Sequence, residues 1–243
     1  MPLKNEGEIK YLEGMETLLK KSKLSDIDKF FNFPVYSQRQ RIAEFIMKYE
    51  IFKKIKNIQG SIVECGVLNG FGLMSFAHFS SILEPVNFNR KIIGFDSFEG
   101  FPSISKKDNK GGVFKAKKGN LKTLSFDELQ KITKLYDLNR SVGHINKIEL
   151  VKGNAIETIP KYLKKNPHLI VSLLYLDFDL YEPTKIALKN FIPRMPKGSI
   201  IAFDELNHPD WPGETMALFE EIGIKNIKIE RFYFDSIRSY AII

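Results

Sequence analysis

Cysteine is almost absent from this chain of 243 residues, in which Cys65 stands alone. A single cysteine excludes an internal disulfide and a zinc site built from several cysteines. It also favours a reducing compartment, so we expect a cytoplasmic protein. Because Cys65 lies inside an apolar run, we expect a packed, unreactive thiol rather than a nucleophile.

Long hydrophobic runs are also missing. No apolar stretch approaches the roughly 20 residues that a membrane span needs, and residues 4–23 lack the apolar core of a secretory signal. We therefore predict neither a membrane nor a secretory role. The net charge of +8 favours acidic ligands such as nucleotides or nucleotide-sugars. Lysines never occur in runs longer than two, and no arginine stripe alternates with aromatics, so we predict no nucleic-acid partner.

Two kinds of segment alternate after residue 60, which is typical of α/β proteins. Short β-branched runs predict strands, and segments with apolar residues at helical spacing predict helices. The strands are expected over 61–67, 91–96, 147–151, 170–178 and 199–203, and the helices over 71–83, 125–136, 155–163, 183–192 and 213–222. Such alternation implies parallel pairing with helices on both faces of the sheet.

The two ends of the chain depart from this alternation. Two adjacent strand-like runs, 226–232 and 236–243, can pair only as an antiparallel hairpin. The fold class predicted is therefore α/β, with a seven-stranded, mostly parallel sheet that ends in an antiparallel C-terminal hairpin. Helices are expected before the sheet over about 8–21 and 37–56. The stretch 102–120 predicts a long insertion, either a linker or a lid over a ligand.

The most informative segment is Ser61–Gly72, in which a β-branched run ends in Glu64 and a glycine-spaced turn opens a helix. Glycine permits a sharp turn and close approach to a ligand, and a helix N-terminus presents unpaired N–H groups. Many open α/β folds bind an adenosine-containing cofactor in this way. The spacing Glu-x-Gly-x-x-x-Gly differs from the dinucleotide fingerprint, which disfavours a nicotinamide enzyme.

Acidic residues follow several of the predicted strands, at the sheet edge where open α/β folds bind ligands. Asp96 comes about thirty positions after the glycine turn, where a carboxylate can accept hydrogen bonds from ribose hydroxyls. The alternative is a turn residue or helix cap.

Three further carboxylates, Asp177, Asp204 and Glu205, leave two apolar strands that we expect to be neighbours. Converging carboxylates repel one another unless a cation lies among them, and oxygen ligands suit Mg²⁺, Ca²⁺ or Mn²⁺ better than zinc. Alternatively, Asp179 and Glu205 cap the helices that follow, which leaves at most two acids close together.

Four blocks carry a family resemblance: 96–102 (DSFEGFP), 153–160 (GNAIETIP), 176–184 (LDFDLYEPT) and 193–198 (PRMPKG). With the glycine turn and the terminal hairpin, they resemble class I S-adenosylmethionine-dependent methyltransferases of Rossmann-like fold. Within that group the chain is similar to the macrocin O-methyltransferase family of sugar O-methyltransferases. The resemblance covers residues 60–243, predicted as the methyltransferase domain, and leaves 1–59 as an N-terminal helical segment forming a lid on the acceptor side.

The resemblance implies methyl transfer from S-adenosylmethionine to a sugar hydroxyl, with help from Mg²⁺ or another divalent cation. The acceptor would be a nucleotide-linked or natural-product deoxysugar. Cofactor-binding roles would fall to Glu64, Gly66, Val67, Asn69, Gly70, Asp96, Ser97, Asn154, Ala155 and Asp177. Metal-binding roles would fall to Asp177, Asp204 and Glu205, although family members typically have two consecutive aspartates where this chain has Asp204 and Glu205.

Two residues are candidates for the proton acceptor. Asp177 is the first, because by the resemblance it would be both a metal ligand and the nearest carboxylate to the reacting oxygen. His208 is the second, because imidazole takes up protons near neutral pH; its alternative is an ordinary loop side chain. Related catechol methyltransferases have a lysine where this chain has Leu180, which disfavours a phenol acceptor. Trp211 either stacks on a sugar or packs its loop.

Three hypotheses remain open at this point. The leading one is the metal-assisted sugar O-methyltransferase. A methyltransferase acting on another hydroxylated acceptor or on nucleic acid is the second, and a non-catalytic adenosine-ligand-binding assembly protein is the third. Arg39 or Arg41 could hold a diphosphate of the acceptor, or could be surface charges. Assembly into a homo-oligomer is left open.

Overall fold

The structure is a computed structural model that describes residues 5–109, 116–121 and 124–243. The chain forms two compact units, residues 1–46 and 47–243. The division predicted at residue 59, with a lid before it, stays a prediction. We describe each unit by itself.

The first unit is helical. It contains α1 (Glu6–Lys21), α2 (Asp26–Phe31), α3 (Phe33–Tyr36) and the start of α4 (Arg39–Ile55). Asn5 and Glu8 form a reciprocal capping box that satisfies two backbone N–H groups at the start of α1. All residues of α1, α2 and α3 are at least partly exposed. Both α2 and α3 are too short for helical periodicity to predict them from the sequence.

The second unit is built on a seven-stranded sheet of order β3-β2-β1-β4-β5-β7-β6. The first five strands pair in parallel, and β7 pairs antiparallel with both β5 and β6, which confirms the predicted fold class. The strands are β1 (Ser61–Cys65), β2 (Ile92–Asp96), β3 (Ile148–Lys152), β4 (Val171–Leu176), β5 (Ile200–Phe203), β6 (Ile229–Arg231) and β7 (Ser239–Ile242).

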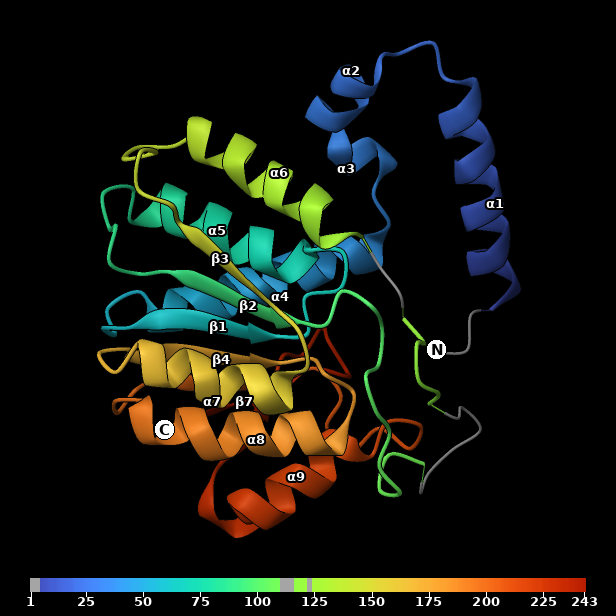
Figure 1. Cartoon of the computed structure of the whole chain (residues 1–243). Helices are drawn as coiled ribbons and strands as arrows, with labels where there is room; N and C mark the ends of the chain where they lie inside the picture. The colour runs from blue at the N-terminus through green and yellow to red at the C-terminus, as the bar shows by residue number, and fades with distance from the viewer. Residues whose placement is uncertain (1–4, 110–115, 122–123) are drawn as a thin grey trace. The chain divides into compact units, whose positions relative to one another are not determined.

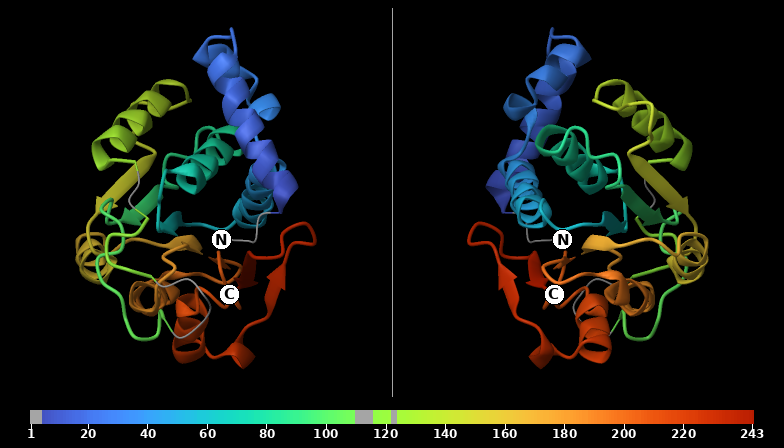
Figure 2. Two further views of the ribbon diagram at one scale, coloured as in Figure 1. Left: turned by 90° about the vertical axis from the view of Figure 1, so that its right-hand side faces the viewer. Right: turned by 90° about the vertical axis from the view of Figure 1, so that its left-hand side faces the viewer.

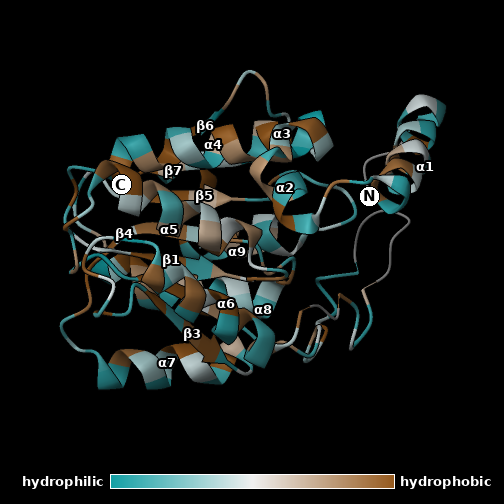
Figure 3. Cartoon of the chain, turned by 90° about the horizontal axis from the view of Figure 1, so that it is seen from above, coloured by the Kyte–Doolittle hydropathy of each residue, from teal (hydrophilic) through white to brown (hydrophobic). Residues whose placement is uncertain are grey.

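Helices cover both faces of this sheet (Figures 1 and 2). In Figure 1, α5 and α6 lie on one face, and α7, α8 and α9 lie on the other. These helices carry polar and apolar residues in alternation (Figure 3), as amphipathic helices do. Their bounds are α5 (Phe71–Leu83), α6 (Phe126–Leu138), α7 (Ala155–Lys165), α8 (Tyr181–Phe191) and α9 (Gly213–Glu221), and the 3₁₀ turns are η1 (Ile192–Arg194) and η2 (Ile224–Asn226).

The central strands form the core. Every residue of β1 and β4 is buried, because helices cover both of their sides. Cys65 is fully buried, and burial raises its thiol pKa well above the ordinary value, as expected for an inert thiol. β4 ends at Leu176 rather than at the predicted residue 178, since the chain leaves the sheet at Asp177 and turns through a positive φ of 60° at Asp179. Within the described residues, each helix is too short or too polar to cross a membrane.

Candidate active site

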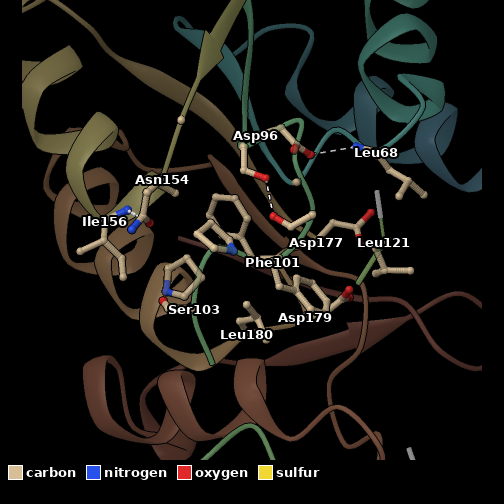
Figure 4. Close-up of a pocket in the computed structure, with 18 residues that line it drawn as sticks. Leu68, Asp96, Phe101, Ser103, Leu121, Asn154, Ile156, Asp177, Asp179 and Leu180 are labelled. Carbon is tan, nitrogen blue, oxygen red and sulfur yellow. Dashed lines mark hydrogen bonds between the residues drawn. The ribbon is translucent and has the colours of Figure 1, made fainter. Parts of the chain in front are cut away.

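A cavity opens at the carboxyl ends of the strands, where open α/β folds bind their ligands. Six of the residues that the sequence predicts for cofactor binding line it: Gly66, Asp96, Ser97, Asn154, Ala155 and Asp177. Figure 4 shows Asp96 and Asn154 on one side of this cavity and Asp177 and Asp179 on another. We call it the acidic cavity, because its described lining contains Asp96, Asp177 and Asp179 and no basic residue.

The turn after β1 is shaped by a backbone contact that only glycine permits. Gly66 adopts φ 95°, and a Cβ there would lie 1.9 Å from the carbonyl oxygen of Asp177. The Asp177 N–H donates to the Cys65 carbonyl at 2.8 Å, which holds the ends of β1 and β4 together. The glycine therefore lets two strand ends meet at the cavity wall.

Asp96 organises the same turn from β2. Its Oδ2 accepts hydrogen bonds from the N–H groups of Val67 at 2.8 Å and Leu68 at 3.0 Å, and its Oδ1 accepts from the Phe98 N–H at 2.7 Å. A carboxylate offers about four lone-pair positions, so Oδ1 keeps one for a further donor. The predicted ribose ligand is thus also a turn-fixing residue, and the two alternatives of the sequence analysis are compatible.

The wall opposite the glycine turn comes from β3 and α7. Gly153, at φ 130°, leads into Asn154, which caps α7 by accepting the Ile156 N–H at 3.2 Å. Ser97 donates its hydroxyl proton to the Gly100 carbonyl at 2.5 Å. This wall presents an amide and small apolar groups, which suit a flat heterocycle.

The other predicted cofactor residues lie outside the cavity lining. Glu64 is buried, with its carboxylate beside Gly72, and Val67 is buried too. Asn69 accepts the Leu124 N–H at 3.0 Å, and Gly70, at φ 83°, precedes α5. These residues belong to the turn or lie next to it, and their contact with a cofactor stays a prediction.

Asp204 lies in a buried network at the end of β5. Its Oδ1 accepts from the Tyr175 hydroxyl at 2.7 Å and from Arg238 Nε at 2.9 Å. Burial acts to raise the pKa of Asp204, but Arg238, Lys48 and the hydrogen bonds outweigh it and hold this pKa below its ordinary value. Asp204 is therefore the member of the predicted metal set that ionises most readily.

The carboxyls nearest Asp204 behave in the opposite way. Burial raises the pKa of Asp177 well above its ordinary value, and Asp204 and Asp179 raise it further against the pull of Lys48. Burial and the Glu205 carboxylate do the same for Asp179. These acids thus influence one another, as the sequence predicts for carboxylates that converge at one sheet edge.

Glu205 and Glu214 extend the cluster. Burial, followed by the nearby Glu214 and Asp204 charges, raises the pKa of Glu205 to about 8. The Glu205 N–H donates to Glu214 Oε2 at 3.1 Å. The buried atoms Glu205 Oε2 and Glu214 Oε1 have no hydrogen-bond partner among the described residues. Such oxygens have the chemistry of hard-cation ligands, although no three acidic, His or Cys side chains in the described ranges are arranged to hold a metal.

Asp179 is a residue that the sequence analysis treated only as a helix cap. The N-cap of α8 is Leu180, without a side-chain cap, and Asp179 instead lines the acidic cavity at positive φ. Asp204 and Glu205 do not belong to that lining. The available signal was the repeated Asp-x-Asp at 177–179, which places both side chains just past the strand.

Lys48 was missed altogether. It lies on α4 within the second unit, is 1% exposed, and places its Nζ 3.7 Å from the centre of the Tyr175 ring. A Cβ on Gly72 would lie 3.1 Å from this Nζ and 1.8 Å from Glu64 Oε1, so ammonium and carboxylate occupy the same buried spot. Lys48 stands three and four positions before the buried Ile51 and Phe52, so helical spacing was the signal that could have placed it on the buried face of α4.

The loop after β5 holds the remaining candidates. His208 lies outside the acidic cavity, and its Nδ1 accepts the Asp210 N–H at 3.2 Å. Trp211 is 8% exposed and packs edge-on against Phe101 with ring centres 6.0 Å apart. Of the two alternatives for Trp211, the structure shows the packing role.

Comparisons with known proteins agree with this geometry. Residues 36–223 match the model of the TylF, or macrocin-O-methyltransferase, family. A crystal structure of CalS11, a calicheamicin methyltransferase, is 30% identical with a TM-score of 0.94, covering 98% of this chain and 93% of its own. No match was found among curated proteins.

Two further structures extend the comparison. An apo structure of CalS11, there described as a TDP-rhamnose 3'-O-methyltransferase, is 28% identical with a TM-score of 0.84 and covers 98% of this chain and 95% of its own. The O-methyltransferase NovP, at 20% identity and a TM-score of 0.62 over 82% of this chain and 78% of its own, shows a likeness of fold alone. The family match spans more than half of the chain, and this chain belongs to the macrocin-O-methyltransferase family.

Proposed function

We propose that this protein transfers a methyl group from S-adenosylmethionine to a hydroxyl of a sugar. The observation that carries the proposal is the acidic cavity, where the ends of β1, β2 and β4 and the start of α7 meet in a chain of this family. A calicheamicin methyltransferase and a TDP-rhamnose 3'-O-methyltransferase, as the relatives are described, support a sugar as the acceptor.

The cavity fits the proposed cofactor. S-adenosylmethionine, when bound, supplies a methyl group already activated on a sulfonium cation. Asp96 keeps one acceptor position on Oδ1 for a ribose hydroxyl, and Asn154 and Ala155 offer an edge for adenine. The carboxylates of the cavity favour the cation electrostatically. Gly66 keeps the turn low enough for close approach.

Removal of the acceptor's proton falls to a carboxylate in this proposal. Asp177 lines the cavity and remains our first choice, and Asp179, which lines it too, joins it. A carboxyl with a raised pKa accepts a proton more readily than an ordinary one. His208 stays a candidate from the sequence alone.

A divalent cation is part of the proposal. The buried, unpartnered oxygens of Glu205 and Glu214 support this part of the proposal by their chemistry alone, because the described acids are not arranged as a metal site. Asp204 would contribute the charge that Arg238 and Tyr175 already orient. Such an ion would lower the cost of forming an alkoxide on the acceptor. Cytoplasmic location, a homo-oligomer and a lid from residues 1–59 remain predictions.

The test is methyl transfer itself. The full chain is incubated with isotope-labelled S-adenosylmethionine, with and without Mg²⁺, and with a panel of nucleotide-linked and free deoxysugars. We expect one added methyl per acceptor by mass spectrometry, and weakened cofactor binding in Asp96→Ala by calorimetry. Cofactor binding without turnover on any hydroxylated acceptor would favour the assembly-protein hypothesis instead.

A further inference from the structure

A second depression adjoins the acidic cavity and has the opposite charge. Its described lining includes Lys106, Lys117 and Lys118 and no carboxylate, and it shares Pro102 and Ser103 with the acidic cavity. We call it the lysine groove. The two depressions therefore border the same short piece of chain, and the described charges of their linings are of opposite sign.

The groove rests on a built frame. Asp108 is 3% exposed, and its carboxylate accepts the N–H groups of Ser105 and Tyr181, each at 2.6 Å. Asn109 Oδ1 accepts the Ala116 N–H at 3.0 Å, which ties the two sides of the loop together. Phe101, Ala116, Leu180 and Trp211 form a small buried cluster beneath. The described parts of the predicted insertion are thus packed onto the rest of the second unit.

The three lysines are available for a ligand. All three are exposed, and none of them forms an ion pair with a described carboxylate. Lys107, in the same loop, differs: it pairs with Glu220 and lies over the Tyr181 ring at 3.9 Å. Three cations without a neighbouring anion repel one another, and a ligand with two adjacent negative charges relieves that repulsion.

We infer that the lysine groove binds the diphosphate of a nucleoside-diphosphate sugar, with the sugar held between the groove and the acidic cavity. This inference rests on the proposed methyl transfer and specifies its acceptor. A sugar joined to a diphosphate reaches one ring away from it, so its hydroxyls face Asp177 and Asp179 while the phosphates stay clear of those acids. Repulsion by the acidic cavity and attraction by the groove then fix the direction of the acceptor.

The experiment measures binding of defined anions to the full chain by calorimetry, with inorganic pyrophosphate, UDP and dTDP as probes. The test variant replaces Lys106, Lys117 and Lys118 by Gln. Its matched control replaces Lys161, Lys164 and Lys165 on α7 by Gln, which changes the net charge equally on another exposed surface. Binding of S-adenosylmethionine to each protein reports whether the fold is intact.

We expect the groove variant to bind the probes at least about tenfold more weakly, with unchanged affinity in the control and for S-adenosylmethionine. Equal loss in both triple variants, or no loss in the groove variant, would overturn the inference. Binding of an RNA oligomer to the groove that dTDP fails to displace would also overturn the inference.

The result is separable from the proposed function. If methyl transfer occurs on phosphate-free sugars and the probes do not bind, the inference fails and the methyltransferase assignment stands. If the groove variant loses pyrophosphate binding and no acceptor is methylated, the anion site stands and the proposed function fails.

Discussion

The acidic cavity and the lysine groove lie side by side and differ in almost every physical respect. The cavity is walled by strand ends whose backbones are fixed by the sheet, and its acids are partly or fully buried. The groove is formed by an insertion between β2 and α6, and its lysines are exposed. Charge in the cavity is therefore strongly coupled through protein, whereas charge in the groove is screened by solvent.

This difference suits the acidic cavity to proton transfer and the lysine groove to attraction of an anionic ligand. Buried carboxyls have shifted pKa values and can exchange protons, as reacting groups must. Exposed lysines keep their charge and steer an anionic ligand without precise geometry. We expect substitutions in the cavity to change the rate of the reaction and substitutions in the groove to change the affinity for the acceptor.

The largest effect is expected for Asp177→Asn. This variant keeps the shape of the side chain and removes its capacity to accept a proton, so we expect turnover to fall by about 10²- to 10⁴-fold. Cofactor affinity measured by calorimetry should stay within about a few-fold, because the contacts proposed for ribose and adenine come from other strand ends. Asp179→Asn serves as the neighbouring comparison. Full activity of Asp177→Asn would remove this residue from the reaction.

The Lys48→Met variant sharpens the contrast between buried and exposed lysines. Its loss removes a buried positive charge near Glu64 and Asp177, whereas Asp204 keeps Arg238, and we expect the free energy of unfolding to fall by about 3 kcal/mol. Lys117→Met, at an exposed groove position, is the control and should change it by less than about 0.5 kcal/mol. Urea unfolding curves of both variants make the comparison. Equal stabilities would show that Lys48 compensates no buried charge.

The pH dependence of stability follows from the raised pKa of Glu205. In the folded protein its pKa is about 8, above the ordinary value of 4.5, so the folded state holds this proton more tightly than the unfolded state. The contribution of Glu205 to the free energy of unfolding is therefore fully present below about pH 4.5. It decreases as pH rises toward 8, by at most about 1.4 kcal/mol per pH unit.

Denaturant unfolding in EDTA at several pH values measures this slope. We expect Glu205→Gln to flatten it and added Mg²⁺ to reduce it, since a bound cation replaces the proton. A wild-type slope that Glu205→Gln leaves unchanged would contradict the assignment.

The smallest effect is expected for a single groove lysine. Lys117→Gln should raise the KM for a nucleoside-diphosphate sugar by about two- to fivefold, with kcat and the KM for S-adenosylmethionine unchanged. The increase should shrink at high salt, because the lysine is exposed. Steady-state kinetics at two ionic strengths measure it. A change in kcat without a change in KM would contradict the assignment of rate effects to the cavity and of affinity effects to the groove.

Much of this arrangement could be predicted from the sequence. The strands and helices after residue 60 lie within a few residues of their predicted bounds, because period-2 and period-3.6 patterns record which faces are buried. Gly66, Asp96, Asn154 and Asp177 could be placed at one edge, since parallel strands end on the same side. Their exact contacts stay predictions until a cofactor is bound.

Other features could not be predicted, because they depend on residues far apart in the chain. Arg238 finds Asp204 across the β5–β7 pairing, and Lys48 reaches Tyr175 from a helix that precedes the sheet. The role considered for Arg39 or Arg41 in holding a diphosphate stays a prediction. The groove lysines, at 106 and 117–118, are brought together only by the fold.

Local patterning by itself determined the α/β alternation, the glycine turn and the acids at strand ends, since each depends on neighbours a few positions away. Only the tertiary structure decided which charges are buried together and which face solvent. Burial and opposing charges are set by packing between distant segments, and they determine the pKa values, the counter-ions and the change of sign between cavity and groove.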